Sequence, residues 1–276
     1  FNHSWACDSV SGGSSKMKAD YTVQDITNAL LDIGISKGDD VFIHSNLGFF
    51  GIFEGCRSAE QLCESFLTAI QSVIGDEGTI VTPTFSYSYC HNEVFDPYKT
   101  KTNCGMLSEY MRETYPDNRT LDPNFSVCGV GKHMVEYMQC NVHEAFGKDS
   151  FWEKFMQHDG KIICMNFDSG STFVHFIERN NNVPYRYNKA FNGTTMMHGI
   201  LKRDYAVHFV FDEPGDAPSM ERVDELCKTH HISKQVNLGK GTILAFSTRE
   251  YYNFFTDLLK VRPRVLCVQE ELPDGK

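Results

Sequence analysis

The residues best suited to act together in chemistry lie in one segment, Asp168 to Glu178, where a threonine, a histidine and a carboxylate follow one another at intervals of three. At about 100° per residue, a helix places Thr172, His175 and Glu178 on one sector and the aromatic residues of the segment on the opposite one. Residues three apart are neighbours on a helix, so Glu178 can orient His175 and raise its basicity. Such an imidazole suits a general base that takes a proton from an attacking amine. The same pattern also fits a structural histidine on a solvated amphipathic helix.

Other motifs in the chain lack the partners that their chemistry needs. Asp168-Ser-Gly-Ser171 is similar to an aspartic-protease signature, but that reaction requires two such carboxylates and the chain has one copy. Gly129-Val-Gly131 lacks the third glycine and the acidic residue of a dinucleotide fingerprint. His230-His231 has no further cysteine or histidine at ligand spacing, and we therefore predict no zinc site and no metal requirement.

Polar side chains also follow three apolar, strand-like runs. They lie at His44-Ser-Asn46, Thr82-Pro-Thr84 and Asn166 to Thr172. In parallel sheets, ligands bind beyond the carboxyl ends of the strands. The free backbone amides after His44 are suited to a pyrophosphate or a pantetheine amide.

The elements that position these residues can be read from caps and periodicity. Helices are predicted at Thr22–Ile33, at Ser58–Ile74, from Ser150, and at Thr172–Asn180, Ser219–Thr229 and Thr248–Lys260. Strands are predicted at Asp40–His44, Thr79–Thr82, Lys161–Asn166, Tyr205–Phe211 and Gly241–Phe246. This alternation predicts an α/β fold, a layered α/β/α domain with a mainly parallel central sheet. Residues 17–276 are expected to form a single domain, and residues 1–16 a disordered leader or remnant.

Composition narrows the function classes. The 276 residues carry a formal net charge of −10, which argues against nucleic-acid binding because phosphate backbones need a basic face. No stretch is long and apolar enough to predict a membrane span. The ten cysteines are scattered without a C-x-x-C pair, and several lie in apolar runs. Free thiols and a cytoplasmic protein are therefore expected.

The order of motifs along the chain resembles that of the aminoglycoside 3-N-acetyltransferase family. Eight segments and one that follows them carry the resemblance, from about residue 22 to the end of the chain. They are Gly38–Leu47, Gly78–Phe85, Phe95–Pro97, Gly105–Glu109, Arg119–Val127, Phe146–Ser150, Asp159–Ile163, Asp168–Glu178 and then Val183–Arg186.

This resemblance implies an acetyltransferase fold, acetyl-CoA as donor, and direct transfer to an amine without an acyl-enzyme. The family's T-x-x-H-x-x-E pattern falls on Thr172, His175 and Glu178. It implies that His175 is the general base, that Glu178 orients it, and that Thr172 donates to the oxyanion of the tetrahedral intermediate. It also implies a coenzyme channel that includes His44, Ser45, Asn46, Leu47, Thr84, Phe85 and Ser126.

The acceptor is less well defined by the resemblance. Asn46 stands where the family usually has a serine, and Asp122 where a histidine commonly precedes the proline. Asp96 and Asp168 are candidate ligands for amino groups, and Arg186 with Lys189 would suit a substrate phosphate. We therefore predict an amino-sugar acceptor, with a nucleotide-linked sugar of surface-polysaccharide synthesis favoured. The alternatives are a true aminoglycoside 3-N-acetyltransferase and a non-catalytic binding module of the same fold. The oligomeric state stays open, with a homo-oligomer among the alternatives.

Overall fold

The computed structural model describes residues 18–212 and 217–268, so the expected leader at residues 1–16 lies outside the described residues. Its helices are α1 (Val23–Asp32), α2 (Ala59–Ile74), α3 (Met106–Thr114), α4 (Met134–Tyr137), α5 (Phe151–Gln157), α6 (Phe173–Asn180), α7 (Met220–Thr229) and α8 (Thr248–Val261). Two short 3₁₀ helices, η1 (Leu47–Phe50) and η2 (Pro116–Asn118), lie between them. The strands are β1 (Asp40–Ser45), β2 (Thr79–Pro83), β3 (Val94–Phe95), β4 (Val127–Gly131), β5 (Lys161–Met165), β6 (Arg186–Met197), β7 (Ile200–Phe211), β8 (Lys234–Leu238) and β9 (Gly241–Ser247).

The central sheet has six strands in the order β4-β2-β1-β5-β9-β8. β1 pairs in parallel with β2 on one side and with β5 on the other. β4 and β9 are antiparallel to their inner neighbours, and β8 is antiparallel to β9. The α/β fold is confirmed, but the sheet is mixed and not mainly parallel: only the two pairings of β1 at the centre are parallel. The carboxyl ends of β1, β2 and β5 therefore meet at one edge.

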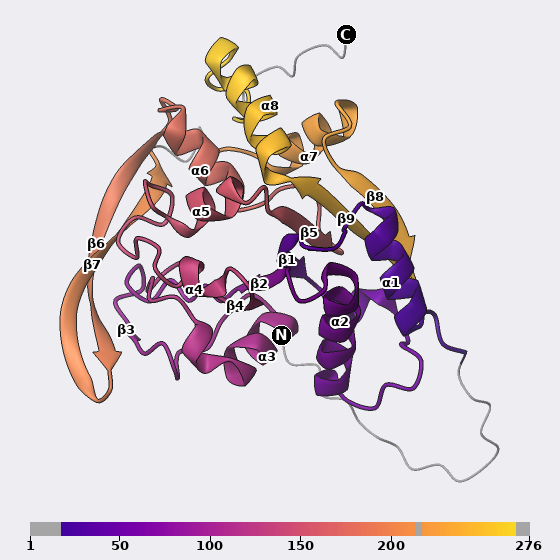
Figure 1. The fold of residues 1–276 in the computed structure, drawn as a ribbon. Helices are drawn as coiled ribbons and strands as arrows, with labels where there is room; N and C mark the ends of the chain where they lie inside the picture. Colours follow the sequence, from indigo (N-terminus) through magenta and orange to yellow (C-terminus); the bar gives the residue numbers. More distant parts are fainter. Residues whose placement is uncertain (1–17, 213–216, 269–276) are drawn as a thin grey trace.

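Helices cover both faces of this sheet (Figure 1). On one face α1, α2 and α3 pack against alternate strand residues such as Val41 and Ile43. On the other face α4 to α8 pack against the intervening residues, of which Phe42 and Cys164 are examples. This division follows from the period of two along a strand, which points successive side chains to opposite faces. The α/β/α layers follow from that alternation.

The predicted helix starts are confirmed by their caps. Thr22 and Asp25 form a reciprocal capping box at α1. Ser58 and Ser150 each accept a hydrogen bond from the backbone three residues later, at the starts of α2 and α5. These bonds satisfy backbone donors that have no partner inside the helix. Because they involve neighbouring residues, the sequence alone identifies them.

A second sheet was not predicted from the sequence. β6 and β7, of twelve residues each, form an antiparallel hairpin, joined at its edge by β3. It curves outward from the main body (Figure 1). Most of its residues are exposed or half-buried, and it lacks the clean apolar alternation that marks a half-buried strand. The strand predicted at Tyr205–Phe211 is the final part of β7.

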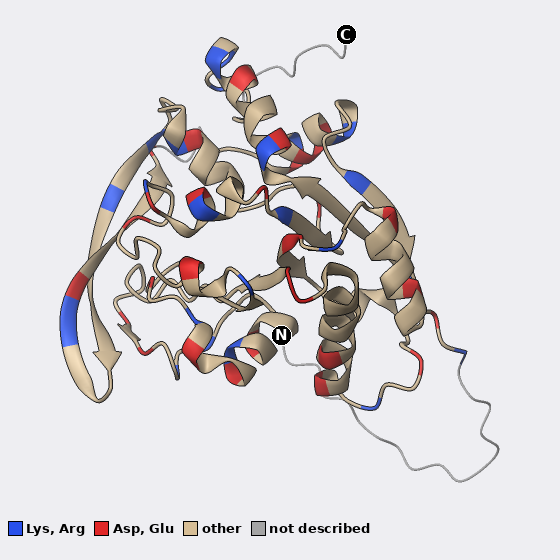
Figure 2. Cartoon of the chain, viewed as in Figure 1, with Lys and Arg blue, Asp and Glu red and all other residues tan. Residues whose placement is uncertain are grey.

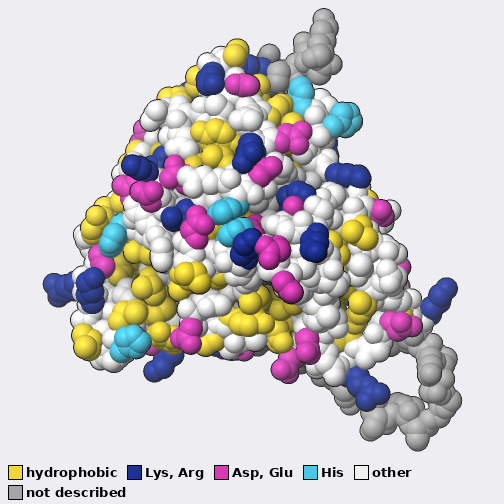
Figure 3. Space-filling model, in the orientation of Figure 1, with side chains coloured by type: hydrophobic (Ala, Val, Ile, Leu, Met, Phe, Trp, Pro, Cys, Tyr) yellow, Lys and Arg dark blue, Asp and Glu magenta, His cyan; other side chains and the backbone are white. Residues whose placement is uncertain are grey.

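Charged residues are spread over the fold. In Figure 2 the positions of acidic and basic residues are interspersed along the ribbon. On the face drawn in Figure 3, hydrophobic side chains gather in the lower part among scattered charged ones. No helix within residues 18–212 and 217–268 is long and apolar enough to cross a membrane.

Candidate active site

A cavity of about 630 Å³ opens at the edge where the three parallel strands end. Its wall includes His44 and Ser45 at the end of β1, Asn46 directly after them, Phe85 after β2, and Thr172 at the start of α6. Leu47 also lines it. The volume lies in the range of about 300–1,000 Å³ that is typical of small-molecule sites. The structure thus brings together six of the residues that sequence analysis placed in the site.

His175 and Glu178 form the predicted pair on α6. Nδ1 of His175 lies 2.9 Å from Oε2 of Glu178. A carboxylate is only an acceptor, so the imidazole donates from Nδ1 and keeps its lone pair on Nε2. The backbone N–H of His175 donates to the carbonyl of Thr172 at 3.1 Å, which places the pair one turn from the cavity wall. The arrangement is that of an oriented general base.

The carboxylate of Glu178 is fully buried and has two further partners. Tyr185 donates its hydroxyl to Oε1 at 2.9 Å, and Nε of Arg186 forms an ion pair with Oε2 at 2.8 Å. Arg186 also donates to the carbonyl of Phe209 at 3.0 Å. The guanidinium of Arg186 is thus largely buried and compensates Glu178, and its predicted contact with a substrate phosphate stays a prediction. Both partners, Tyr185 and Arg186, belong to the Val183–Arg186 segment that the family resemblance had singled out.

These contacts set the protonation of the pair. Burial lowers the pKa of His175 more than the neighbouring carboxylate raises it, so the imidazole is neutral near pH 7. Burial alone would raise the pKa of Glu178, but the bond to His175, the charge of Arg186 and the Tyr185 hydroxyl together lower it. A neutral histidine held by a charged carboxylate can accept a proton.

Comparison with known proteins decides the family. The model of the aminoglycoside 3-N-acetyltransferase family matches residues 42–260 of this chain. The chain belongs to that family. The resemblance inferred from the order of the motifs is confirmed, and all the residues that line the cavity or form the His175–Glu178 pair lie inside the matched range.

Relatives in this family are distant in sequence. The aminoglycoside N(3)-acetyltransferase III of Serratia marcescens is 23% identical over 177 residues, which cover 57% of this chain and 64% of the relative. The chain thus aligns with less than two thirds of that relative's length. Among solved structures, sisomicin-bound AAC-VIa superposes with a TM-score of 0.74 at 18% identity, covering 88% of this chain and 98% of the other. A binary structure of AAC-IIIb with CoASH gives 0.73 at 16% identity, covering 91% and 99%. Both share the fold.

His44 is held against Ser171, which lies just before α6. Its Nε2 is hydrogen-bonded to Oγ of Ser171 at 2.9 Å, and burial lowers its pKa to about 4. Ser45 has a buried hydroxyl without a hydrogen-bond partner. A buried unsatisfied hydroxyl is costly, so a ligand group that reaches it gains affinity.

Thr84 and Ser126 do not face the cavity. Both are completely buried, and the Thr84 hydroxyl donates to that of Ser126 at 3.1 Å. Arg119 adds hydrogen bonds to the Ser126 hydroxyl and the Thr84 carbonyl. This network joins the exit of β2 to the start of β4, behind Phe85. Sequence reasoning identified the right segments but could not tell a lining side chain from one beneath it.

The carboxylates of Asp96 and Asp168 accept hydrogen bonds from backbone groups of their own loops. Oδ1 of Asp96 accepts the backbone N–H of Tyr98 and of Lys99, and Oδ1 of Asp168 accepts that of Gly170. Neither carboxylate lines the cavity of about 630 Å³. Their predicted contact with an acceptor stays a prediction.

His208 on β7 was missed by sequence reasoning. Its ring lies 4.8 Å from that of Phe125 and 6.3 Å from that of Phe146, which itself packs edge-on against His175. Burial is the largest effect on its pKa and lowers it to about 3. No local pattern marks His208, because the hairpin brings it beside His175 across 33 positions of the chain.

Proposed function

We propose that this protein is an acetyl-CoA-dependent N-acetyltransferase that modifies an amino group of an aminoglycoside. The observation that carries the proposal is the buried His175–Glu178 pair, which starts one turn from Thr172 on the cavity wall. Family membership supports it, as do the relatives named for aminoglycoside N(3)-acetylation.

The cavity suits the coenzyme on the chemistry of its wall. Polar groups at His44 and Asn46 alternate with the apolar surface of Leu47, Phe85 and Met106. The unpartnered hydroxyl of Ser45 offers a hydrogen bond to a pantetheine amide. When bound there, acetyl-CoA would supply a thioester carbonyl to which the acceptor nitrogen adds before the C–S bond breaks.

The side chains of α6 then divide the work. His175 Nε2 takes the proton that the nitrogen loses and can pass it to the departing sulfur. Glu178 keeps the imidazole in the tautomer that this requires and stabilises its charged form. Thr172 lines the cavity, and its hydroxyl can donate to the oxygen that becomes negative, a contact that typically contributes about 10²–10³-fold in rate.

An aminoglycoside is the better supported acceptor. The nucleotide-linked alternative relied on Arg186 and Lys189 to bind a phosphate, and Arg186 is engaged with buried Glu178. The Lys189 ammonium lies over the ring of Phe191 on the hairpin, 5.0 Å from its centroid. None of the reported relatives is named for a nucleotide-linked sugar.

Release of coenzyme A tests the proposal. Purified protein should release it from acetyl-CoA in the presence of sisomicin or gentamicin and should form the N-acetylated product by mass spectrometry. Turnover only with nucleotide-linked amino sugars would restore the other acceptor. Acetyl-CoA binding without turnover on either class would favour the non-catalytic module.

A further inference from the structure

A second group of chemically competent side chains lies at the opposite end of β1. Asp40 is the first residue of this strand, whereas His44 is near its last. Four residues of strand span about 13 Å, so this end is remote from the cavity. His133, just before α4, and His158, just after α5, complete the group.

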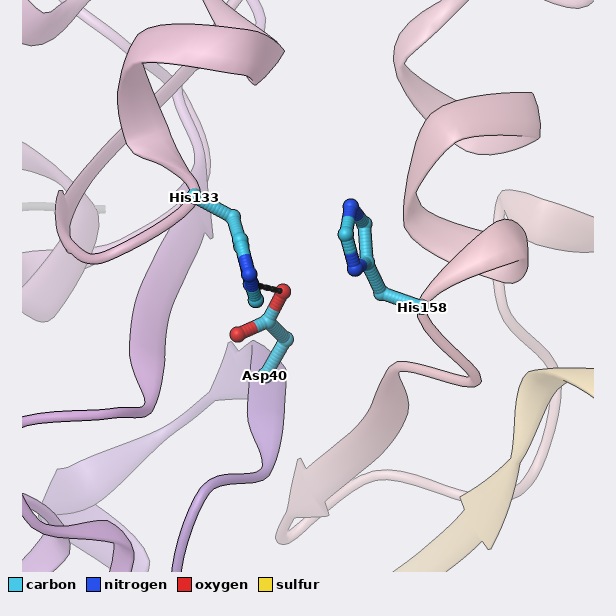
Figure 4. A group of neighbouring side chains, drawn as sticks. All are labelled: Asp40, His133 and His158. Carbon is cyan, nitrogen blue, oxygen red and sulfur yellow. Dashed lines mark hydrogen bonds and ion pairs between the residues drawn. The ribbon is translucent and has the colours of Figure 1, made fainter.

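The three side chains converge closely. Nδ1 of His133 lies 2.9 Å from Oδ2 of Asp40, and one ligand atom from each of the three residues lies within 4.8 Å of the others. Figure 4 shows the two imidazole rings facing each other above the Asp40 carboxylate. Their centroids are 4.0 Å apart with an interplanar angle of 20°.

The Asp40 carboxylate has unused capacity. Its side chain is only 1% exposed, and its Oδ2 accepts from both His133 and the hydroxyl of Tyr137. Its Oδ1 is buried and has no hydrogen-bond partner. Buried carboxylate oxygens are normally satisfied, so this atom points to a missing positive partner.

Glu136 prepares His158 for binding a cation. Nε2 of His158 lies 2.9 Å from Oε2 of Glu136, so the ring donates from Nε2 and keeps the lone pair on Nδ1. Figure 4 shows that this second ring nitrogen is the one facing Asp40. A carboxylate that holds the outer nitrogen of a ligating histidine is the usual arrangement around protein-bound zinc.

The geometry points to a zinc site formed by Asp40, His133 and His158, with water completing the coordination. Two imidazoles and one carboxylate suit Zn²⁺ or a similar transition metal, and do not suit Mg²⁺, which prefers oxygen ligands. Ligand atoms on one tetrahedral zinc lie roughly 3.4 Å apart, and the two rings must rotate out of their stacked arrangement to aim one nitrogen of each at the same ion. Both rings are partly exposed, at 24% and 28%, which leaves room for this movement and a path for the ion.

Such an ion would be structural. It would join the start of β1 to α4 and α5, which cover the same face of the sheet through Tyr137, Phe151 and Phe155. It departs from the sequence-based prediction of no zinc site, but it keeps the prediction that acetyl transfer itself requires no metal. The inference does not rest on the proposed function.

Calorimetric titration of chelator-treated full-length protein with ZnCl₂ tests the site. One equivalent should bind and raise the melting temperature, whereas MgCl₂ should do neither. His158→Ala and His133→Ala should each weaken zinc binding by more than about 100-fold, because even an outer partner is worth about 10–100-fold. Glu136→Gln, at a 40% exposed side chain that should not disturb folding, should weaken it by about tenfold or more.

The double variant His230→Ala/His231→Ala is the matched control, since both residues are exposed and lie outside the group. It should bind zinc like the unaltered chain. Co²⁺ should give d–d absorption without a thiolate charge-transfer band, which excludes the cysteines as ligands. Zinc binding that is absent, that survives loss of His133 and His158, or that shows thiolate bands would overturn the site.

Discussion

A histidine–carboxylate pair lies on α6, near the cavity at the carboxyl end of β1, and another lies at the start of β1 in different surroundings. In each pair an imidazole Nδ1 lies 2.9 Å from a buried carboxylate oxygen, His175 with Glu178 and His133 with Asp40. Glu178 also has Tyr185 and Arg186 as partners, so both of its carboxylate oxygens interact with protein groups. Asp40 has an oxygen without a partner and a second imidazole nearby.

This difference shows that a histidine–carboxylate pair does not define its own chemistry. A fully compensated carboxylate stabilises one tautomer and leaves one free nitrogen, which suits a base. An under-compensated carboxylate beside a second imidazole, whose facing nitrogen keeps its lone pair, attracts a cation. The neighbours of the carboxylate decide between the two.

The largest expected effect separates the two histidines by activity. His175→Ala should lower kcat by about 10²–10⁴-fold with little change in acetyl-CoA affinity, because the base acts only in the chemical step. His133→Ala should leave kcat unchanged. In the unaltered protein the rate should rise with pH through a pKa below the usual value for histidine, and this limb should be absent in His175→Ala.

Melting temperatures measured beside these rates distinguish a structural role. If His175→Ala folds normally and turns over like the unaltered chain, the assignment of the base is wrong.

The next effect concerns compensation of the carboxylate. Arg186→Met should destabilise the protein by about 3 kcal/mol, because it leaves Glu178 buried without its cationic partner. Urea unfolding measures this loss. Arg203→Met, at an exposed position of the same hairpin, is the control and should change the free energy of unfolding by less than about 0.5 kcal/mol. Equal effects of the two variants would contradict the role given to Arg186.

Acid should weaken the cavity end through its buried histidines. Burial lowers the pKa of His44 to about 4, while the unfolded chain titrates near 6.5. Between these values the unfolded state binds more protons, so the free energy of unfolding falls as pH drops from about 6.5 to about 4. His44 contributes up to about 1.4 kcal/mol per pH unit in this window.

His44→Gln should flatten this dependence, measured by urea unfolding at a series of pH values. His230→Ala, an exposed histidine, should retain it. An unchanged slope in His44→Gln would show that His44 is not held neutral in the folded state.

The smallest effect on stability is expected at the start of β1, beside Asp40. In chelator-treated protein, Glu136→Gln should change the free energy of unfolding by less than about 1 kcal/mol, because it removes a half-exposed pair. With zinc present, the difference in free energy of unfolding between Glu136→Gln and the unaltered chain should grow, since His158 then binds the metal without its hydrogen bond to Glu136. A large loss without zinc would mean that Glu136 supports the fold itself.

The sequence by itself determined the features that depend on near neighbours. The caps at Thr22, Ser58 and Ser150, the strand at Asp40 and the helical sector of His175 and Glu178 all involve residues within a few positions of each other. Cap hydrogen bonds and side-chain periodicity are local, so residue types reveal them directly. The order of the motifs was sufficient to identify the family.

Only the tertiary structure decided which of these residues work together. It paired Arg186 with Glu178, buried Thr84 and Ser126 behind the cavity, and brought His208 beside His175. It also joined Asp40 to His133 and His158 across about a hundred positions of the chain. The physical reason is that sheet pairing and helix packing bring distant residues together, and no local spacing records which side chains then share a buried carboxylate or a cavity wall.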